Sequence, residues 1–159
     1  MKILVPIIVV VAVIWLMVVF VRSKGAGREP TYATRDQIPS IVSKLQQTGR
    51  DGSFVVFMFS IPNNRDETLP NLQYSIETGR LGFDWVLIAP QNIKDEAPVL
   101  DFIKRLGYTA SKREMNDVCH LRVEGKGIED LGLKLLRDFY HLAPEAKLEL
   151  IIEGFDMKE

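Results

Sequence analysis

The clearest feature in the pattern of apolar and polar residues is an unbroken apolar run near the amino terminus. The nineteen residues from Ile3 to Val21 include no charged or strongly polar side chain, and fifteen of them are Val, Ile, Leu or Phe. A helix of this length covers roughly 28 Å, close to the hydrocarbon thickness of a bilayer, with an insertion free energy of roughly −5 to −9 kcal/mol. The run predicts a transmembrane helix, and residues 1–23 are assigned to a membrane anchor.

The charges that flank this run predict its fate and its orientation. A cleaved signal peptide is the alternative, but its apolar region is usually only about 7–15 residues long and ends in a small-x-small cleavage site. Here Arg22, Lys24 and Arg28 follow the run, against Lys2 on its other side. This excess predicts a single-pass protein of the cell membrane with a cytoplasmic domain. Cys119, the only cysteine, cannot form an internal disulfide, which suits a reducing compartment.

The rest of the chain predicts a short linker and one soluble domain. Residues 24–33 are rich in Gly, Pro and small polar residues, as linkers are, and residues 34–159 contain no internal repeat. From Glu29 onward there are 16 Lys and Arg against 21 Asp and Glu, a net charge of −5. An acidic domain without a basic stripe is not expected to bind nucleic acid.

Within this domain the spacing of the apolar residues changes between that of helices and that of strands. Thr34 to Gln37 matches a capping box, and the regular helix is expected to begin near Ile38 and to stop at Gly49. Strands are predicted over residues 53–61, 72–78, 83–89, 108–114, 118–124 and 147–155, and further helices over residues 95–106 and 128–142. The order α-β-β-β-α-β-β-α-β predicts an α+β fold with a largely antiparallel sheet and helices on one face.

The strand predicted at residues 53–61 is unusual because both of its faces are apolar. One side carries Phe54, Val56 and Met58, and the other carries Val55, Phe57, Phe59 and Ile61. In the strand at residues 72–78, by contrast, Gln73 and Ser75 alternate with apolar residues, which is typical of a strand with one solvated face. The second face of residues 53–61 is therefore expected to be covered within the chain, by the terminal segment or the linker, or by another chain.

Several short patterns carry a resemblance to a known fold. They are Phe54 to Phe59, Leu72 to Glu77, Trp85 to Ala89, Ile103 to Tyr108 and Leu121 to Glu124. In this succession, residues 34–142 resemble the small α+β fold of type III secretion chaperones and related bacterial chaperone-like domains. The resemblance implies a small, acidic, non-enzymatic dimer that holds an extended segment of a partner against apolar patches. The predicted anchor and the last strand depart from that pattern, so the resemblance supports a binding scaffold and says little about secretion.

The residue types used in catalysis and metal binding are few and scattered. Cys119 and His120 are neighbours in a predicted strand, so their side chains point to opposite faces and cannot act as a pair. Cys119 shares its side with Leu121 and Val123 and is expected to be an inert core thiol, whereas His120 is expected to be solvated beside Arg122. One cysteine and two histidines do not make a zinc site, and no metal or cofactor is predicted.

Two further positions have a possible chemical role. Asp84 precedes Trp85 in an apolar strand, and if buried it needs a partner such as Arg80. The stretch Gly125 to Gly127 precedes a helix and offers backbone N–H groups and one lysine to a phosphate. It lacks the length and the hydroxyl of a P-loop, so a connecting turn is the preferred interpretation.

The sequence therefore favours a membrane-anchored, non-enzymatic scaffold that contacts a protein partner or a second copy of itself through the sheet. The candidate anchors for this contact are Phe57, Phe59, Trp85 and Ile88, because aromatic and aliphatic side chains on a sheet contribute most when they are desolvated. The alternative is a membrane-tethered sensor that binds a small molecule at a sheet edge or a dimer seam. An enzyme without a recognisable motif is the third hypothesis.

Overall fold

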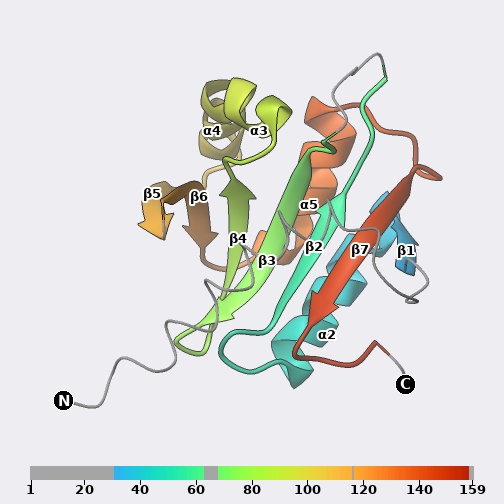
Figure 1. Ribbon diagram of the computed structural model, residues 1–159, viewed down its shortest axis with the longest axis vertical. Helices are drawn as coiled ribbons and strands as arrows, with labels where there is room; N and C mark the ends of the chain where they lie inside the picture. The colour runs from blue at the N-terminus through green and yellow to red at the C-terminus, as the bar shows by residue number, and fades with distance from the viewer. Residues whose placement is uncertain (1–30, 63–67, 116, 158–159) are drawn as a thin grey trace. The chain divides into compact units, whose positions relative to one another are not determined.

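The computed structural model of the 159-residue chain describes residues 31–62, 68–115 and 117–157 (Figure 1). The strands are β1 (Thr31–Thr34), β2 (Phe54–Met58), β3 (Asn71–Glu77), β4 (Arg80–Val86), β5 (Ala110–Met115), β6 (Val118–Glu124) and β7 (Lys147–Glu153). The helical segments are η1 (Arg35–Gln37), α2 (Ile38–Thr48), α3 (Pro90–Lys94), α4 (Glu96–Arg105), η2 (Ile128–Asp130), α5 (Leu131–Lys134) and η3 (Leu135–Phe139), the last of which is a π-helix.

The seven strands form one sheet in the order β1-β7-β2-β3-β4-β6-β5, and each neighbouring pair is antiparallel. Helix α2 and the helical stretch that contains α5 lie behind one face of this sheet, and α3 and α4 lie beyond the end of β4 (Figure 1). The predicted α+β class with an antiparallel sheet is confirmed.

The predicted transmembrane run, Ile3 to Val21, lies outside the described residues. Within residues 31–62, 68–115 and 117–157, no helix is both long enough and apolar enough to cross a membrane.

The structure adds two elements to the predicted order. Strand β1 pairs with β7, with Thr31 opposite Leu150, so residues 31–33 belong to the sheet and not to the linker predicted over residues 24–33. Pro90, expected only to end a strand, begins the short helix α3. Proline is favourable there because the N–H it lacks would have no partner in the first helical turn.

Signals in the local sequence determine the ends of α2. The backbone N–H of Thr34 donates to the Gln37 side-chain oxygen at 2.8 Å, which is one half of the predicted capping box. Pro39 lies in the first turn of the helix, and Gly49 follows the last one. The prediction that the regular helix begins near Ile38 is confirmed.

The hairpin between β3 and β4 fixes which residues of these strands face each other. Thr78 and Gly79 both have positive φ, 51° and 71°, as a two-residue type I′ hairpin requires. The backbone N–H of Gly79 donates to the Asp51 carboxylate at 2.6 Å. The resulting register places Ser75 opposite Gly82.

The helix-side core lies between the helices and the inner face of the sheet. Its sheet members include Val55, Phe57, Phe59, Leu72, Tyr74, Phe83, Trp85, Leu121, Val123 and Leu148, and its helix members include Ile38, Val42, Leu45, Val99, Ile103, Leu131 and Leu135. The hydroxyl of Tyr74 donates to the Ile128 carbonyl at 2.8 Å and accepts from the Gly132 N–H at 2.8 Å. Burial raises the pKa of Tyr74 far above its usual value, so the hydroxyl stays neutral and ties β3 to the helical stretch.

The face of the sheet away from the helices, called the distal face below, has its own set of residues, most of them buried. Its members are Phe54, Val56, Met58, Gln73, Ser75, Gly82, Asp84, Val86, His120, Arg122 and Glu124. The apolar members, Phe54, Val56, Met58 and Val86, are buried but do not belong to the helix-side core. Both faces of β2 are thus buried in the single chain.

The polar face predicted for β3 is not solvated. Gln73 and Ser75 are only 4% and 2% exposed, so the prediction of a wet face for this strand is wrong. Ser75 tolerates burial because its hydroxyl is bonded to the charged side chains of Asp84 and Arg122 on the neighbouring strands.

Replacing Tyr74 by Phe tests the tie between the sheet and the helices. Two buried backbone groups would lose their partner, so the free energy of unfolding should fall by about 1–3 kcal/mol, measured by equilibrium urea unfolding of the full chain in detergent. Tyr108→Phe is the matched control, because that hydroxyl donates to the Gly127 carbonyl from a half-exposed side chain and water can replace it. Equal losses in the two variants would contradict the role given to Tyr74.

Candidate functional site

A buried ion pair between Arg122 and Asp84 lies on the distal face, toward the β5 edge of the sheet. The two residues are opposite each other on β6 and β4, and they are 1% and 2% exposed. Nη1 of Arg122 donates to both carboxylate oxygens of Asp84 and to Oγ of Ser75, each at 2.9 Å, and Oγ of Ser75 donates to Oδ2 of Asp84 at 2.6 Å. Buried charges are tolerated only when they are paired and hydrogen-bonded, and both conditions are met here.

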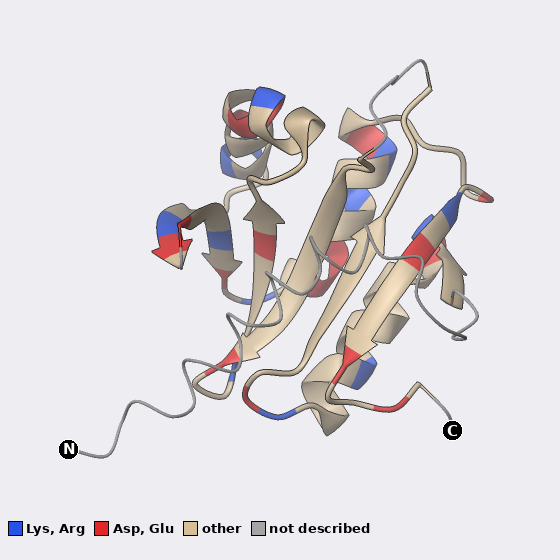
Figure 2. Cartoon of the chain, viewed as in Figure 1, with Lys and Arg blue, Asp and Glu red and all other residues tan. Residues whose placement is uncertain are grey.

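A second shell of charges surrounds this pair. Nε of Arg122 donates to Glu124 at 2.8 Å, and its Nη1 lies 3.5 Å from Glu77. Arg113 of the edge strand β5 lies 3.3 Å from Glu77 and 3.5 Å from Glu124, and Arg80 lies 3.4 Å from Glu124. Opposite charges therefore alternate on neighbouring strands (Figure 2). This distal charge network consists of three arginines and three carboxylates: Arg80, Arg113, Arg122, Glu77, Asp84 and Glu124.

The partner predicted for Asp84 was wrong. Arg80 is opposite Glu77 in the register, at the hairpin end of β4, and its largely exposed side chain reaches Glu124 and not Asp84. The partner of Asp84 is Arg122, which lies next to it only because β4 pairs with β6. No signal in the local sequence around Asp84 identifies it.

Two members of this network, Arg122 and Glu124, have shifted pKa values. Burial by itself lowers the pKa of Arg122, but the Asp84 carboxylate and the bond to Glu124 outweigh burial and raise it. The hydrogen bond from Arg122 lowers the pKa of Glu124 below its usual value. The stability that Glu124 contributes is therefore present above its unfolded pKa and is lost as the pH falls through the lower folded value. Both shifts favour the charged forms of Arg122 and Glu124 in the folded protein.

Gly82 leaves the space in which the Arg122 guanidinium lies. A Cβ atom on Gly82 would lie within van der Waals overlap of the Arg122 guanidinium carbon and both of its terminal nitrogens. The φ of Gly82 is not positive, so the glycine is required for close approach and not for backbone conformation. The position of the Arg122 side chain therefore requires glycine at position 82.

His120 is buried, although it was predicted to be solvated. It is 4% exposed on the distal face, opposite Val86 and Arg113, and its Nδ1 atom has no hydrogen-bond partner. The local sequence does not show that His120 lies between β4 and β5 with Val86 and Arg113 as its cross-strand neighbours. Cys119 points to the other face and is half-buried, with its Sγ 4.0 Å from the Glu114 carboxylate.

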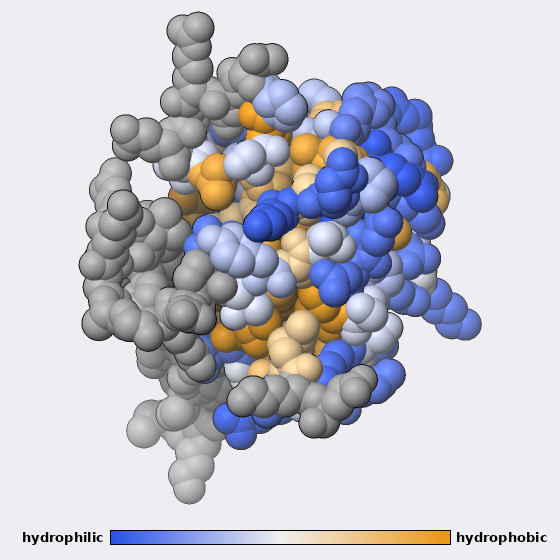
Figure 3. Space-filling view, turned by 90° about the vertical axis from the view of Figure 1, so that its right-hand side faces the viewer, coloured by the Kyte–Doolittle hydropathy of each residue, from blue (hydrophilic) through white to orange (hydrophobic). Residues whose placement is uncertain are grey.

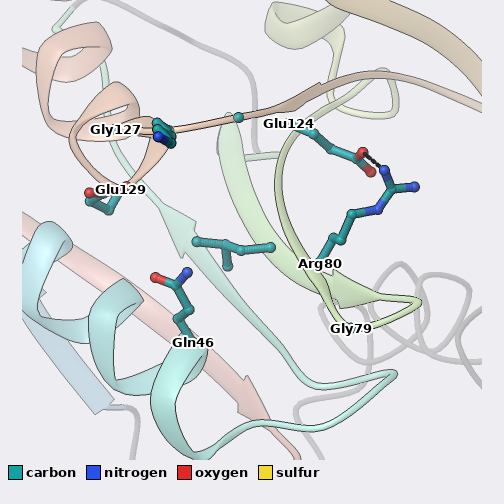
Figure 4. Close-up of a pocket in the computed structure, with 9 residues that line it drawn as sticks. Gln46, Gly79, Arg80, Glu124, Gly127 and Glu129 are labelled. Carbon is teal, nitrogen blue, oxygen red and sulfur yellow. Dashed lines mark ion pairs between the residues drawn. The ribbon is translucent and has the colours of Figure 1, made fainter.

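A polar hollow lies where β4 begins and where β6 and α2 end. It has a volume of about 670 Å³ and is lined by Gln46, Gly79, Arg80, Leu81, Glu124, Gly125, Lys126, Gly127 and Glu129. In Figure 4 the side chains of Arg80 and Glu124 point toward each other at one side, and Gln46 and Glu129 lie across from them. The Gly125 to Gly127 stretch forms the turn from β6 into η2, as predicted. The hollow offers both signs of charge to a small polar molecule.

The four predicted partner anchors lie in different surroundings. Phe57, Phe59 and Trp85 are at most 1% exposed in the helix-side core, and Nε1 of Trp85 donates to the Asn92 carbonyl at 3.1 Å. Ile88 is half-buried beyond the end of β4. In this arrangement the helices pack against the three aromatic residues.

Metal binding and known relatives give no further assignment. No group of three or more His, Cys, Asp and Glu within residues 31–62, 68–115 and 117–157 is arranged to hold a metal ion. Comparison of the chain with protein-family models, with curated proteins and with solved structures gives no match.

Replacing Gly82 by Ala tests the close packing of the network. The new methyl group would displace the Arg122 guanidinium from Asp84, and the free energy of unfolding should fall by about 2–4 kcal/mol, measured by urea unfolding. Gly79→Ala is the control, because a Cβ there meets no atom within 4 Å. Its positive φ alone should cost about 1 kcal/mol. A Gly82 variant no less stable than the Gly79 variant would contradict the packing described.

Proposed function

We propose that the chain is a single-pass protein of the cell membrane whose folded domain is a binding or assembly scaffold of chaperone-like type, without catalytic activity. The length and composition of the run Ile3 to Val21 support the anchor. The positive charges that follow this run support a cytoplasmic domain. The distal face is the proposed contact surface, for a protein partner or for a second copy of the chain.

The composition of the distal face is the observation that carries this proposal. Apolar side chains of β2 lie there beside Ile151 of β7, next to a charge network that is neutral as a whole. The helices of the described residues lie on the other face or beyond the end of the sheet (Figure 1). A sheet face of this kind is stable when another layer packs on it.

The neutrality of the network indicates what kind of contact the face can make. Each arginine already has a carboxylate partner, so a bound protein needs no compensating charge. The free energy of contact would then come from burial of the apolar surface that is still exposed on this face, such as part of Ile151, at about 25 cal/mol per Å². Long-range electrostatic attraction would contribute little.

The state of the charged groups supports binding over catalysis. A general acid or base needs a pKa near the working pH and a proton within reach of a substrate. Arg122 and Glu124 are shifted away from neutrality in opposite directions. Asp84 is fully occupied by Arg122 and Ser75.

The hollow beside Arg80 and Glu124 favours a second candidate function. Its mixed charges and open position suit a small zwitterionic or polar molecule, as a membrane-tethered sensor would bind. Because Glu124 belongs to both the hollow and the distal charge network, a ligand there could act on the distal face. If this second function is correct, a small polar molecule should still bind in the hollow when apolar residues of the distal face are replaced.

Replacing Ile151 by Asp tests the proposed contact. Ile151 is half-buried and lies opposite Val56 on the distal face, so a carboxylate there should abolish association without unfolding the domain. Ile93→Asp is the matched control, because Ile93 is 53% exposed on α3. Sedimentation of the full chain in detergent measures self-association, and co-purification from membranes measures binding to a partner. If a folded Ile151 variant associates like the control, the distal face is not the contact surface.

A further inference from the structure

The edge formed by β1 and β7 presents an aromatic residue and a lysine together. Tyr32 is 55% exposed, the highest value among the large apolar and aromatic side chains of the described residues. The ammonium of Lys147 lies 5.9 Å from the centroid of its ring. Figure 3, which views the molecule from this side, shows apolar residues between polar ones near the sheet and mostly hydrophilic residues on the helix side.

Few residues of the sequence separate this edge from the predicted anchor. Tyr32 is eleven residues after Val21, the last residue of the apolar run. Eleven residues span at most about 40 Å when fully extended, and roughly 18 Å on average as a flexible chain. If the run crosses a bilayer, β1 is the part of the sheet that the membrane reaches first.

The two side chains have the chemistry of a membrane interface. Tyrosine combines an apolar ring with a polar hydroxyl and is enriched at the level of lipid headgroups. Lysine can lay its aliphatic stem on apolar groups while its ammonium bonds to a phosphate. Glu149 lies opposite Tyr32 in the register, so this edge has no excess positive charge for general attraction to anionic lipid. A short-range contact with individual headgroups fits these observations better than electrostatic adsorption.

We infer that Tyr32 and Lys147 rest on phospholipid headgroups, with Lys147 bonded to a phosphate and the Tyr32 ring in the interface. This inference rests on the proposed membrane anchor and adds an orientation to it. The β1 edge faces the bilayer, and Tyr32, which lies opposite Glu149 on the distal side of the sheet, marks the part of that side nearest the lipid.

The test uses the full chain with Cys119→Ser in phosphatidylcholine nanodiscs that contain a lipid with a nitroxide on its headgroup. One fluorescent label is placed at Thr31→Cys, which leaves Tyr32 intact, and another at Ile93→Cys on α3. The label at position 31 should be quenched more strongly than the label at position 93. Adding Tyr32→Ser and Lys147→Ser should lower the quenching at position 31 to the level seen at position 93.

Two results would overturn the inference. Equal quenching at positions 31 and 93 would show that the edge does not face the bilayer. Unchanged quenching after the double serine substitution would show that the tether alone keeps the edge close. Extraction of the chain from membranes by alkaline carbonate separates these cases from a failure of the anchor. A chain that stays in the membrane but gives either result overturns only the headgroup contact, whereas a chain that is extracted overturns the anchor as well.

Discussion

The structure depends on one constraint: in residues 31–62, 68–115 and 117–157, the helices cover one face of a seven-stranded sheet (Figure 1) in which β2 is apolar on both faces. On the helix side, β2 contributes Val55 and Phe57 to the main core, and Phe59 follows just after the strand. On the distal side it contributes a second apolar group, and the strands beside it continue that layer with charged side chains instead of apolar ones. The distal face is therefore a second ordered layer of the molecule, half apolar and half ionic, and not a solvated surface.

The ionic half of this layer specifies strand pairing more than it adds stability. A buried ion pair often contributes little net free energy compared with apolar residues of the same volume, because both charges lose their hydration. The ion pair disfavours other registers of β6 against β4. A slip by one residue would carry Arg122 to the helix side of the sheet and leave Asp84 without its partner. Gly82 adds a steric condition, because only the observed register places a residue without a Cβ beneath the guanidinium. A face fixed in this way keeps one arrangement of charges that balance one another.

The sequence predicted the elements of the fold well because their signals are local. The alternation of strands and the helical spacing after Thr34 and Asp95 depend on residues a few positions apart. The distal charge network could not be predicted, because Asp84 and Arg122 are 38 residues apart and meet only through the pairing of β4 with β6. For the same reason, the sequence could not predict the burial of His120 or the surroundings of the three aromatic residues proposed as anchors. Apolar composition shows that Phe57, Phe59 and Trp85 need cover, but only the topology shows that helices provide it.

The part of the chain that precedes Thr31 gives the proposal its cellular setting, and the distal face gives it a surface. In the proposed function, the charges on the distal face neutralise one another, so a partner would bind through apolar contact. That idea depends on Arg122 and Asp84 acting as one unit in the folded protein.

A double-mutant cycle of Arg122→Met and Asp84→Leu, followed by urea unfolding of the full chain, tests this central claim most directly. Each single substitution leaves one buried charge without its partner and should lower the free energy of unfolding by about 3–5 kcal/mol, whereas the double variant should lose much less than the sum. Losses that simply add would contradict the account, because they would show that the two charges are stabilised independently of each other.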